Sequence, residues 1–416
     1  MKKHIHVPDA ARTRLSSPRF SVPLQPAFAS LPPLALYVHL PWCVRKCPYC
    51  DFNSHALRGE LDEARYVQAL LADLDRELPA VWGRAVHSVF IGGGTPSLFS
   101  PDAIDRLLAG VNARVRVSRD AEVTLEANPG SVDSARLRGF AQAGVTRLSV
   151  GVQSFDDAVL PRIGRIHDAA AARAAVHAAL ASGAARVNVD LMFALPGQDT
   201  ASVGQDVATV LGMGVEHVSF YQLTLEPNTA FHRDPPPLPA EAIAARMQEQ
   251  GIGALAAAGL ERYEVSGFAR PPARCRHNLN YWRFGDYLGI GAGAHGKITQ
   301  AAPAAVTRSI KQRHPARYLA AALAGDADLS RGEVAAAELP FEFMLNALRL
   351  CEGVEAELFS AATGLPLDAI ANALARARED GLLLDDPRRI APSVLGQRFL
   401  DDLVARFLPG TSAQGF

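Results

Sequence analysis

The sequence predicts an α/β protein in two parts, an incomplete barrel of six strand–helix units followed by a small, mostly helical domain. Three observations predict this. From residue 34 to about residue 270, short apolar runs alternate with amphipathic stretches of helical length, the pattern of parallel strands joined by right-handed crossovers. Cysteines, glycines and isolated polar residues follow the apolar runs. Beyond residue 308 the alternation gives way to helix-like segments.

The six units can be placed along the chain. The apolar runs predict strands at 34–40, 86–91, 121–127, 147–153, 187–195 and 217–225. The amphipathic stretches predict helices at 62–78, 101–112, 133–143, 168–181, 200–213 and 240–258. Six units are too few to close an eight-stranded TIM barrel, so we expect an incomplete, TIM-like (β/α)6 barrel over residues 34–270 with its chemistry at the carboxyl ends of the strands.

Composition narrows the class of protein. The 416 residues are 49% hydrophobic and carry a net charge of −1, so a large core is expected and neither a nucleic-acid partner nor a transmembrane segment is indicated. Five cysteines and no secretory signal favour a cytoplasmic location. Residues 1–33 show no apolar periodicity, which predicts a disordered tail.

A cysteine loop follows the first predicted strand. It has the spacing C-x3-C-x2-C, formed by Cys43, Cys47 and Cys50. Such a loop can place three thiolates on three irons of a 4Fe-4S cubane and leave the fourth iron open to another ligand. A zinc site completed by His39 or His55 remains an alternative, although structural zinc usually takes two separated C-x-x-C halves.

Polar residues and glycines mark the other strand ends. Gly92-Gly-Gly-Thr-Pro96 follows the second strand, and Glu126, Gln153 and Asp190 mark the third, fourth and fifth. Three glycines let backbone approach a ligand closely and offer N–H groups to it. The run matches neither phosphate-binding glycine motif. Together with the cysteine loop, these residues predict one polar pocket on the rim of the barrel.

The cysteine loop, the glycine run and the strand-end polar residues resemble the radical S-adenosylmethionine (radical SAM) superfamily over residues 34–270. The resemblance implies a barrel of the radical SAM type and a 4Fe-4S cluster whose open iron is chelated by S-adenosylmethionine, which electron transfer converts to a 5′-deoxyadenosyl radical. It also implies a set of S-adenosylmethionine-binding positions: Tyr37, Tyr49, Gly94, Thr95, Pro96, Glu126, Gln153, Arg165 and Asp190.

Within the superfamily, the chain resembles the oxygen-independent coproporphyrinogen oxidase-like subfamily. The decarboxylating enzymes carry a further cysteine two residues after the third, where this chain has Phe52. The stretch from Tyr37 to His55 is instead similar to the HemW branch of haem chaperones. The chain also contains a run that resembles the HNxxYW signature of that branch, which implies four haem-binding candidates: His277, Asn278, Tyr281 and Trp282.

The residue types in this run suit a porphyrin. Imidazole is the commonest protein ligand of haem iron, and tyrosine and tryptophan offer flat apolar faces. Arg274 and Arg276 could pair with the propionates, and His295, in a glycine-rich stretch, is the second choice of ligand. We therefore assign residues 271–308 to a haem-linked segment. A satisfied structural histidine is the alternative for His277.

Residues 309–416 predict a winged-helix-like domain. Helix-like segments at 341–350, 354–362 and 366–380 precede a short apolar run at 382–384 and a last helix at 394–408. A DNA-binding domain would need a basic recognition helix, but the third helix carries more acidic than basic residues: Asp368, Glu379 and Asp380 against Arg376 and Arg378. We expect a packing or partner-docking module.

The leading functional hypothesis is a HemW-type haem chaperone. It would bind haem, a 4Fe-4S cluster and S-adenosylmethionine, and deliver haem to a respiratory acceptor protein. The alternatives are an oxygen-independent coproporphyrinogen III dehydrogenase, which would oxidatively decarboxylate propionate side chains, and a zinc-stabilised scaffold with a DNA-binding tail. Homodimerisation, transient membrane association and cleavage of S-adenosylmethionine are left open by the sequence.

Overall fold

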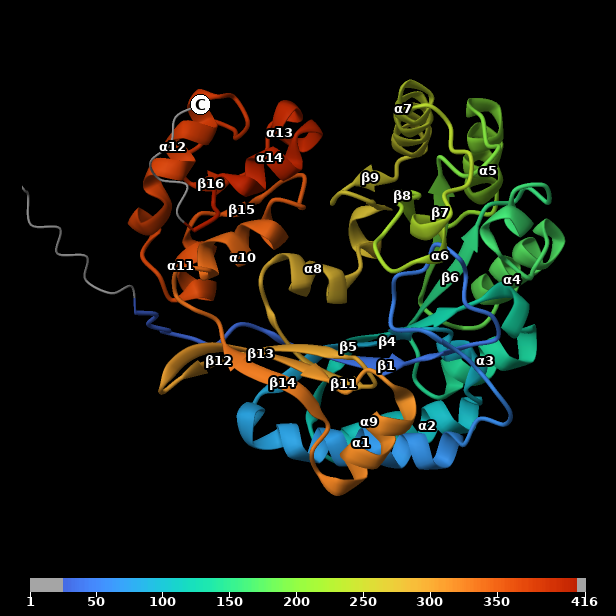
Figure 1. Cartoon of the computed structure of the whole chain (residues 1–416), viewed down its shortest axis with the longest axis horizontal. Coiled ribbons are helices and arrows are strands. Elements are labelled where there is room, and N and C mark those ends of the chain that lie inside the picture. Colours follow the sequence, from blue (N-terminus) through green and yellow to red (C-terminus); the bar gives the residue numbers. More distant parts are fainter. Residues whose placement is uncertain (1–24, 410–416) are drawn as a thin grey trace, which may run out of the picture.

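The computed structural model describes residues 25–409. Its centre is a curved twelve-stranded sheet in the order β14-β13-β12-β11-β1-β4-β5-β6-β7-β8-β10-β9, which Figure 1 shows with helices on its outer side. Six neighbouring parallel strands form the incomplete barrel: β1 (Leu34–Leu40), β4 (Ala85–Gly93), β5 (Arg116–Ala127), β6 (Arg147–Gln153), β7 (Arg186–Phe193) and β8 (His217–Gln222). The predicted six-unit fold class is confirmed.

One helix of the predicted series follows each barrel strand. These helices are α1 (Glu63–Glu77), α2 (Pro101–Asn112), α3 (Ser134–Gln142), α4 (Ala169–Leu180), α5 (Thr200–Gly212) and α7 (Glu241–Ala257). Local chemistry explains why they begin where they do, because all but α7 start at a side chain that accepts a backbone N–H of the first turn. The capping residues are Asp62, Ser100, Asp133, Asp168 and Asp199.

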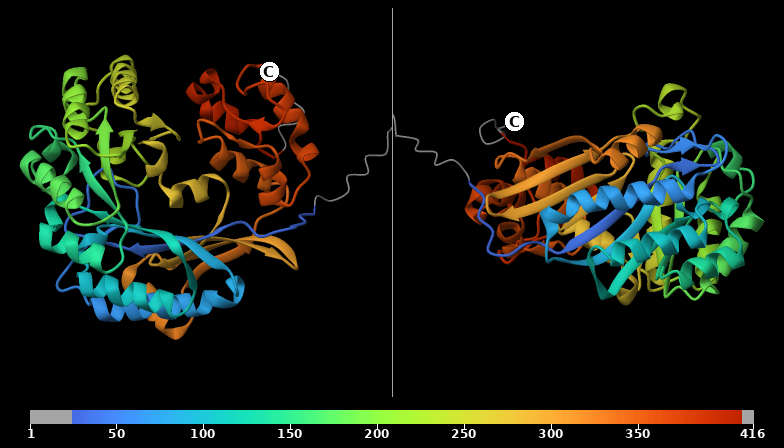
Figure 2. Two further views of the ribbon diagram at one scale, coloured as in Figure 1. Left: turned by 180° about the vertical axis from the view of Figure 1, so that it is seen from behind. Right: turned by 90° about the horizontal axis from the view of Figure 1, so that it is seen from below.

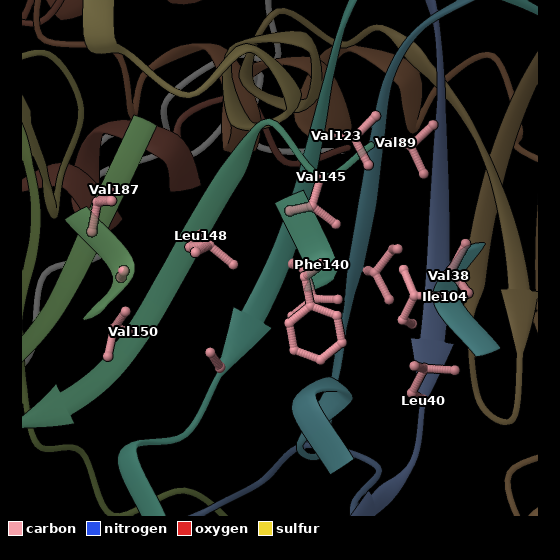
Figure 3. Close-up of a cluster of buried hydrophobic side chains, with 14 of the residues drawn as sticks. Val38, Leu40, Val89, Ile104, Val123, Phe140, Val145, Leu148, Val150 and Val187 are labelled. Carbon is pink, nitrogen blue, oxygen red and sulfur yellow. The ribbon is translucent and has the colours of Figure 1, made fainter. Parts of the chain in front are cut away.

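The two faces of the barrel strands differ in chemistry. Outward side chains pack against the helices to form the main hydrophobic core, part of which Figure 3 shows around Val38, Val89 and Phe140. Because side chains alternate along a strand, the intervening residues face the hollow of the barrel. Many of these are polar and buried, including Ser88, Glu122, Arg147, Asn188 and His217.

The sheet extends beyond the barrel on both sides. β11 (Asp286–Gly291) pairs in parallel with β1 and is followed by three antiparallel strands: β12 (His295–Ala301), β13 (Ala304–Lys311) and β14 (Asp328–Glu333). On the other side, β10 (Gly267–Ala269) and β9 (Glu261–Arg262) add to β8. Much of the predicted haem-linked segment 271–308 is therefore sheet.

Buried ion pairs hold the added strands. Lys311 Nζ on β13 lies 2.7 Å from both Asp73 and Glu77 on α1, and Lys297 Nζ on β12 lies 2.9 Å from Asp286 on β11. The helix α9 (Pro315–Ala324) returns against α1. Residues 309–333, which contain the end of β13, α9 and β14, thus pack with the barrel and not with the C-terminal unit.

A second hydrophobic core holds the C-terminal unit together, in which the first helix begins at Leu339. Its elements are α10 (Leu339–Ala347), β15 (Val354–Glu355), α11 (Glu357–Thr363), α12 (Ala371–Glu379), β16 (Arg389–Ile390), α13 (Val394–Arg398) and α14 (Leu400–Ala405). A mostly helical unit with one small two-stranded sheet agrees with the winged-helix-like prediction. This unit stands at one end of the curved sheet, and α8 (Arg276–Trp282) lies between it and the barrel (Figures 1 and 2).

Part of the predicted tail is packed. Residues 1–24 lie outside the described part of the chain, but 25–33 connect both units: Ala27 N donates to Gly364 O at 2.9 Å, and Asp286 N donates to Pro33 O at 2.9 Å. Phe28 packs against the second core. Between residues 25 and 409, no single helix is long and apolar enough to cross a bilayer. One pair of helical segments, Glu357–Thr363 and Leu367–Glu379, reaches that length and apolar composition when the two are taken together, but the pair is sharply bent.

Candidate functional site

A cavity of about 330 Å³ opens at the carboxyl ends of the barrel strands. Its lining includes all three cysteines of the loop and all but one of the predicted S-adenosylmethionine positions: Cys43, Cys47, Tyr49, Cys50, Gly94, Thr95, Pro96, Glu126, Gln153, Arg165 and Asp190. The structure thus brings together side chains that are separated by up to 147 positions in the chain. The exception is Tyr37.

The cysteine loop is held by its own backbone pairing. β2 (Trp42–Cys43) pairs in parallel with β3 (His55–Ala56), and Leu57 N donates to Cys43 O at 2.8 Å. The three thiols are free. This loop therefore offers three sulfur donors that face one cavity.

The donor set suits a cubane cluster. A cubane takes one thiolate per iron, so its three ligands need not converge on one point; within residues 25–409, no group of three or more His, Cys, Asp or Glu side chains could hold a single metal ion. Burial raises the pKa of the Cys43 and Cys50 thiols. Cluster binding would therefore release protons, because iron binds the thiolate.

The glycine run serves close packing between the second strand and the cysteine loop. Gly94 N donates to Leu40 O at 2.9 Å, and Thr95 N donates to Trp42 O at 2.7 Å. A Cβ atom at Gly94 would lie 2.6 Å from Trp42 O, a distance that backbone cannot accommodate. The glycine run thereby sets the distance between the second barrel strand and the cysteine loop. The Gly93 N–H donates a hydrogen bond to Glu126 Oε2 at 3.0 Å.

Two carboxyls in the cavity repel one another. Burial first, and the neighbouring Asp190 second, raise the pKa of Glu126 to about 8, while the Gly93 N–H opposes this rise. Burial also raises the pKa of Asp190, and hydrogen bonds from Asn188 and from two serines oppose it. A pair of desolvated acids favours a ligand that brings positive charge.

The fourth strand ends in a strained residue. Gln153 has a φ of 73°, a left-handed conformation that costs energy in a non-glycine residue. Its Oε1 accepts a hydrogen bond from the hydroxyl of Tyr221 at 2.7 Å. Arg165 donates to Gly151 O and, at 3.8 Å, to Cys47 Sγ. These contacts fix the side of the cavity next to the cysteine loop.

Tyr221 lines the cavity although it is not among the site residues predicted from the sequence. The signal was present, because His217, Ser219 and Tyr221 alternate along the last barrel strand, and alternate residues share one face. Met192, Thr224 and Glu226 also line the cavity and carried no motif.

Tyr37 lies outside the lining. Its hydroxyl is 2.9 Å from His39 Nδ1, and His39 Nε2 is 3.0 Å from Asn53 O in the cysteine loop. Burial lowers the pKa of His39 to about 4, so the ring is neutral. Here Tyr37 supports the cysteine loop from inside the barrel, and its contact with a bound cofactor stays a prediction.

The four haem candidates lie on the short helix α8 and do not face one space. His277 is 8% exposed and points into the barrel, where Nδ1 is 3.2 Å from Ser88 Oγ and the ring centre is 5.0 Å from that of Phe90. Burial lowers the pKa of His277 to about 4, so this imidazole is neutral and enclosed. Asn278 is partly buried.

The aromatic pair of α8 packs elsewhere. The ring of Tyr281 lies 5.0 Å from that of Tyr287, and the guanidinium of Arg349, from the C-terminal unit, stacks 4.3 Å from the ring centre of Trp282. Arg274 and Arg276 already pair with Glu352 and Asp120, respectively. His295 is exposed on β12.

A second cavity, of about 400 Å³, borders α8 on the side of residues 30–33 and α11. Leu279 and Leu358 give it apolar walls, and Arg276 and Arg283 line it as well. Ser88, the partner of His277, also lines it. This cavity combines apolar surface with cationic groups next to the motif helix.

Sequence and structure comparisons place the chain among known proteins. The Radical SAM superfamily matches residues 37–209, and the HemN C-terminal domain matches residues 334–399. Heme chaperone HemW of Escherichia coli (strain K12) is 46% identical over 91% of this chain and 99% of its own length. The corresponding protein of Haemophilus influenzae is 43% identical over 91% of this chain and 98% of its own.

The fold is also shared with a solved structure. Coproporphyrinogen III oxidase (HemN) from Escherichia coli superposes with a TM-score of 0.77 at 23% identity, over 91% of this chain and 90% of that one. At that identity the likeness shows the fold alone. The near-full-length identities show the family: the chain belongs to the HemW family of radical SAM proteins.

Proposed function

We propose that this protein is a haem chaperone that carries a 4Fe-4S cluster and S-adenosylmethionine on its barrel rim, binds haem, and passes it to a respiratory acceptor protein. The observation that carries the proposal is the near-full-length similarity to relatives named heme chaperones, with 46% identity over 91% of the chain. A radical SAM domain implies the cluster and S-adenosylmethionine.

The rim cavity supplies suitable groups for both cofactors. Cys43, Cys47 and Cys50 would hold the cluster, which, when bound, supplies a Lewis-acidic iron and a one-electron donor. Glu126 and Asp190 would offset the positive charge of the ligand, since both acids are desolvated beside one another. The remaining predicted positions that line the cavity would orient the ligand: Tyr49, Gly94, Thr95, Pro96, Gln153 and Arg165.

For haem, the proposed element is α8 with the cavity beside it. Leu279 and Leu358 would contact the macrocycle, and Arg283 would meet a propionate, because guanidinium groups bind carboxylates strongly. Arg276 lines the same cavity but already pairs with Asp120. The guanidinium of Arg283 forms no hydrogen bond or ion pair with the described residues and is thus available. His277 remains the proposed iron ligand; since Ser88 separates its ring from this cavity, ligation requires a movement of α8 or of Ser88.

A haem titration tests the proposal. The cluster is reconstituted anaerobically, haem is added, and the mixture is passed through gel filtration with absorption spectroscopy. We expect stoichiometric haem to elute with the protein. His277→Ala should shift the Soret band or weaken retention, whereas His177→Ala, at an exposed histidine on α4, should change neither. Loss of all haem from the wild-type protein on the column would contradict the proposal.

The alternative activity, coproporphyrinogen III dehydrogenation, rests on the shared fold. Phe52 stands where the decarboxylating enzymes carry a cysteine, and its side chain is 62% exposed. The same reconstituted preparation distinguishes the two functions. Formation of protoporphyrinogen IX from coproporphyrinogen III, with S-adenosylmethionine, a reductant for the cluster and an electron acceptor all supplied, would favour the enzyme.

A further inference from the structure

A line of buried polar side chains runs beneath the rim cavity from Asp190 to Tyr263. Asn188 Nδ2 lies 2.8 Å from Asp190 Oδ1. His217 Nδ1 lies 2.6 Å from Asn188 Oδ1, and His217 Nε2 lies 2.9 Å from the hydroxyl of Tyr263. Asn188, His217 and Tyr263 are buried, His217 and Tyr263 being each 2% exposed, and Asp190 is half-buried at the cavity. Only Asp190 belongs to the site described above.

The amide of Asn188 is held between Asp190 and His217, with its nitrogen toward the carboxylate. A carboxylate only accepts hydrogen bonds, so the NH₂ group of Asn188 must face Asp190; the same nitrogen donates to Ser149 Oγ at 2.8 Å. The amide oxygen is then left for His217 and for Ser219 Oγ, which donates to it at 3.2 Å. The opposite orientation would set the amide oxygen against the carboxylate.

The amide orientation identifies the tautomer of His217. Burial, and next the positive charge of Arg147, lower the pKa of His217 well below its ordinary value, so the imidazole is neutral and has one N–H. Because Asn188 Oδ1 can only accept, the proton lies on Nδ1. Nε2 therefore accepts the hydroxyl hydrogen of Tyr263. Every donor in the line points toward Asp190.

The far end of the line is also fixed. Cys351 N, from the C-terminal unit, donates to Tyr263 O at 3.1 Å, and the guanidinium of Arg274 lies 5.6 Å from the centre of the Tyr263 ring. The tyrosine ring is thus held where the two units meet. Its hydroxyl has a settled position from which to donate to His217.

We infer that His217 is a positioning residue of the cofactor cavity: by donating to Asn188 it aims the amide of that residue at Asp190 and so fixes the carboxylate that faces the ligand. The inference rests on the proposed binding of S-adenosylmethionine in this cavity. His217 touches neither the cavity nor the cysteine loop, and it acts through Asn188 alone.

The test compares two substitutions at one site. In His217→Asn the amide nitrogen occupies roughly the place of Nδ1 and keeps the donor, whereas His217→Leu removes it. With cluster-reconstituted protein and S-adenosylmethionine, isothermal titration should give about tenfold weaker binding for His217→Leu, the usual effect of one lost hydrogen bond to a buried polar group. His217→Asn should bind S-adenosylmethionine with an affinity within about twofold of that of the wild-type protein, because the asparagine keeps the hydrogen bond to Asn188.

A matched control separates positioning from general loss of stability. Like His217, Tyr318 has a buried side chain that donates one hydrogen bond, to Asp73 at 2.8 Å, but it lies outside the line. Tyr318→Phe should leave the affinity for S-adenosylmethionine unchanged. In the wild-type protein, ¹⁵N NMR of labelled histidine should report a neutral Nδ1–H tautomer for His217 at neutral pH.

Three results would overturn the inference. They are unaltered affinity in a folded His217→Leu protein, loss of affinity in His217→Asn equal to that in His217→Leu, and an Nε2–H tautomer in the wild-type protein. The NMR measurement needs no variant, so it decides even where His217→Leu does not fold. No haem is present in these measurements, so their failure is distinguishable from failure of the haem-chaperone function.

Discussion

Replacing Glu126 by glutamine removes an acid that folding places in an unfavourable setting. Burial and the nearby Asp190 raise its pKa from 4.5 to about 8. Between about pH 4.5 and pH 8, Glu126 is protonated in the folded protein and ionised in the unfolded chain. The contribution of this group to stability is therefore fully present below about pH 4.5 and is lost as the pH rises toward 8.

The size of the effect follows from the same two values. The difference between 4.5 and about 8, at about 1.36 kcal/mol per pKa unit, gives at most about 5 kcal/mol. Glu126 borders a cavity that admits water, and screening reduces the figure, so about 2 to 3 kcal/mol is the expected loss. Glutamine does not titrate, and the Gly93 N–H can still donate to its side-chain oxygen.

Urea denaturation of the cluster-free protein between about pH 5 and pH 8 measures how the contribution of Glu126 to the free energy of unfolding changes with pH. The free energy of unfolding of the wild-type protein should fall relative to that of Glu126→Gln as the pH rises, and the two should converge near pH 4.5. Glu333→Gln, at an exposed glutamate on β14, should run parallel to the wild-type protein. Parallel curves for Glu126→Gln as well would refute the reasoning.

Two further perturbations follow from other contacts. Lys297→Met should destabilise the protein by about 2 to 3 kcal/mol in the same urea assay, because it leaves the fully buried Asp286 with Arg84, 2.8 Å away, as its remaining cation. Lys297→Met combined with Asp286→Asn should recover part of the loss, and no recovery would contradict the ion-pair explanation. Asn53→Ala should make the reconstituted protein lose iron and sulfide to a chelator faster at unchanged helicity. The reason is that Asn53 Nδ2 ties the cysteine loop to the backbone carbonyls of Ala292 and Arg313, just after β11 and β13, at 2.8 Å each. Equal loss rates would contradict that role.

The six barrel units were predictable because local signals define them. The runs 34–40 and 147–153 match β1 and β6 to the residue, and the helix 101–112 matches α2, which a serine cap and a first-turn proline mark. β5 starts at Arg116, five residues earlier than predicted. The prediction missed this part because its residues are mostly polar and at least partly exposed. Alternation of apolar residues does not detect such an extension.

The added strands could not be predicted in the same way. β11 pairs with β1, about 250 residues earlier in the chain, and the register depends on glycines at which any side chain would collide; a Cβ at Gly291 would lie 2.3 Å from His39 O. The sequence shows the glycines but not the strand that they meet. Because this pairing is not visible in the sequence, the sequence predicts that the C-terminal unit starts at residue 309. In the structure, β13 and β14 still belong to the main sheet.

The grouping of the rim residues was largely predictable, and the packing of the residues on α8 was not. Strand-end position alone brought Glu126, Gln153 and Asp190 to one cavity, because parallel strands end at the same edge. The direction of His277 depends on how α8 packs against Ser88 and Phe90, which no motif encodes. The HNxxYW run indicates the helix beside which haem is proposed to bind, without showing which way its imidazole points.

Transfer of haem tests the central claim most directly. The cluster-reconstituted protein is loaded with haem, freed of excess by gel filtration, and mixed anaerobically with the haem-free form of a respiratory haem protein. A chaperone should lose its own haem spectrum while the acceptor gains its spectrum and activity, faster than from free haem at the same concentration. Haem that stays on this protein, or that reaches the acceptor no faster than free haem does, would contradict the proposed function.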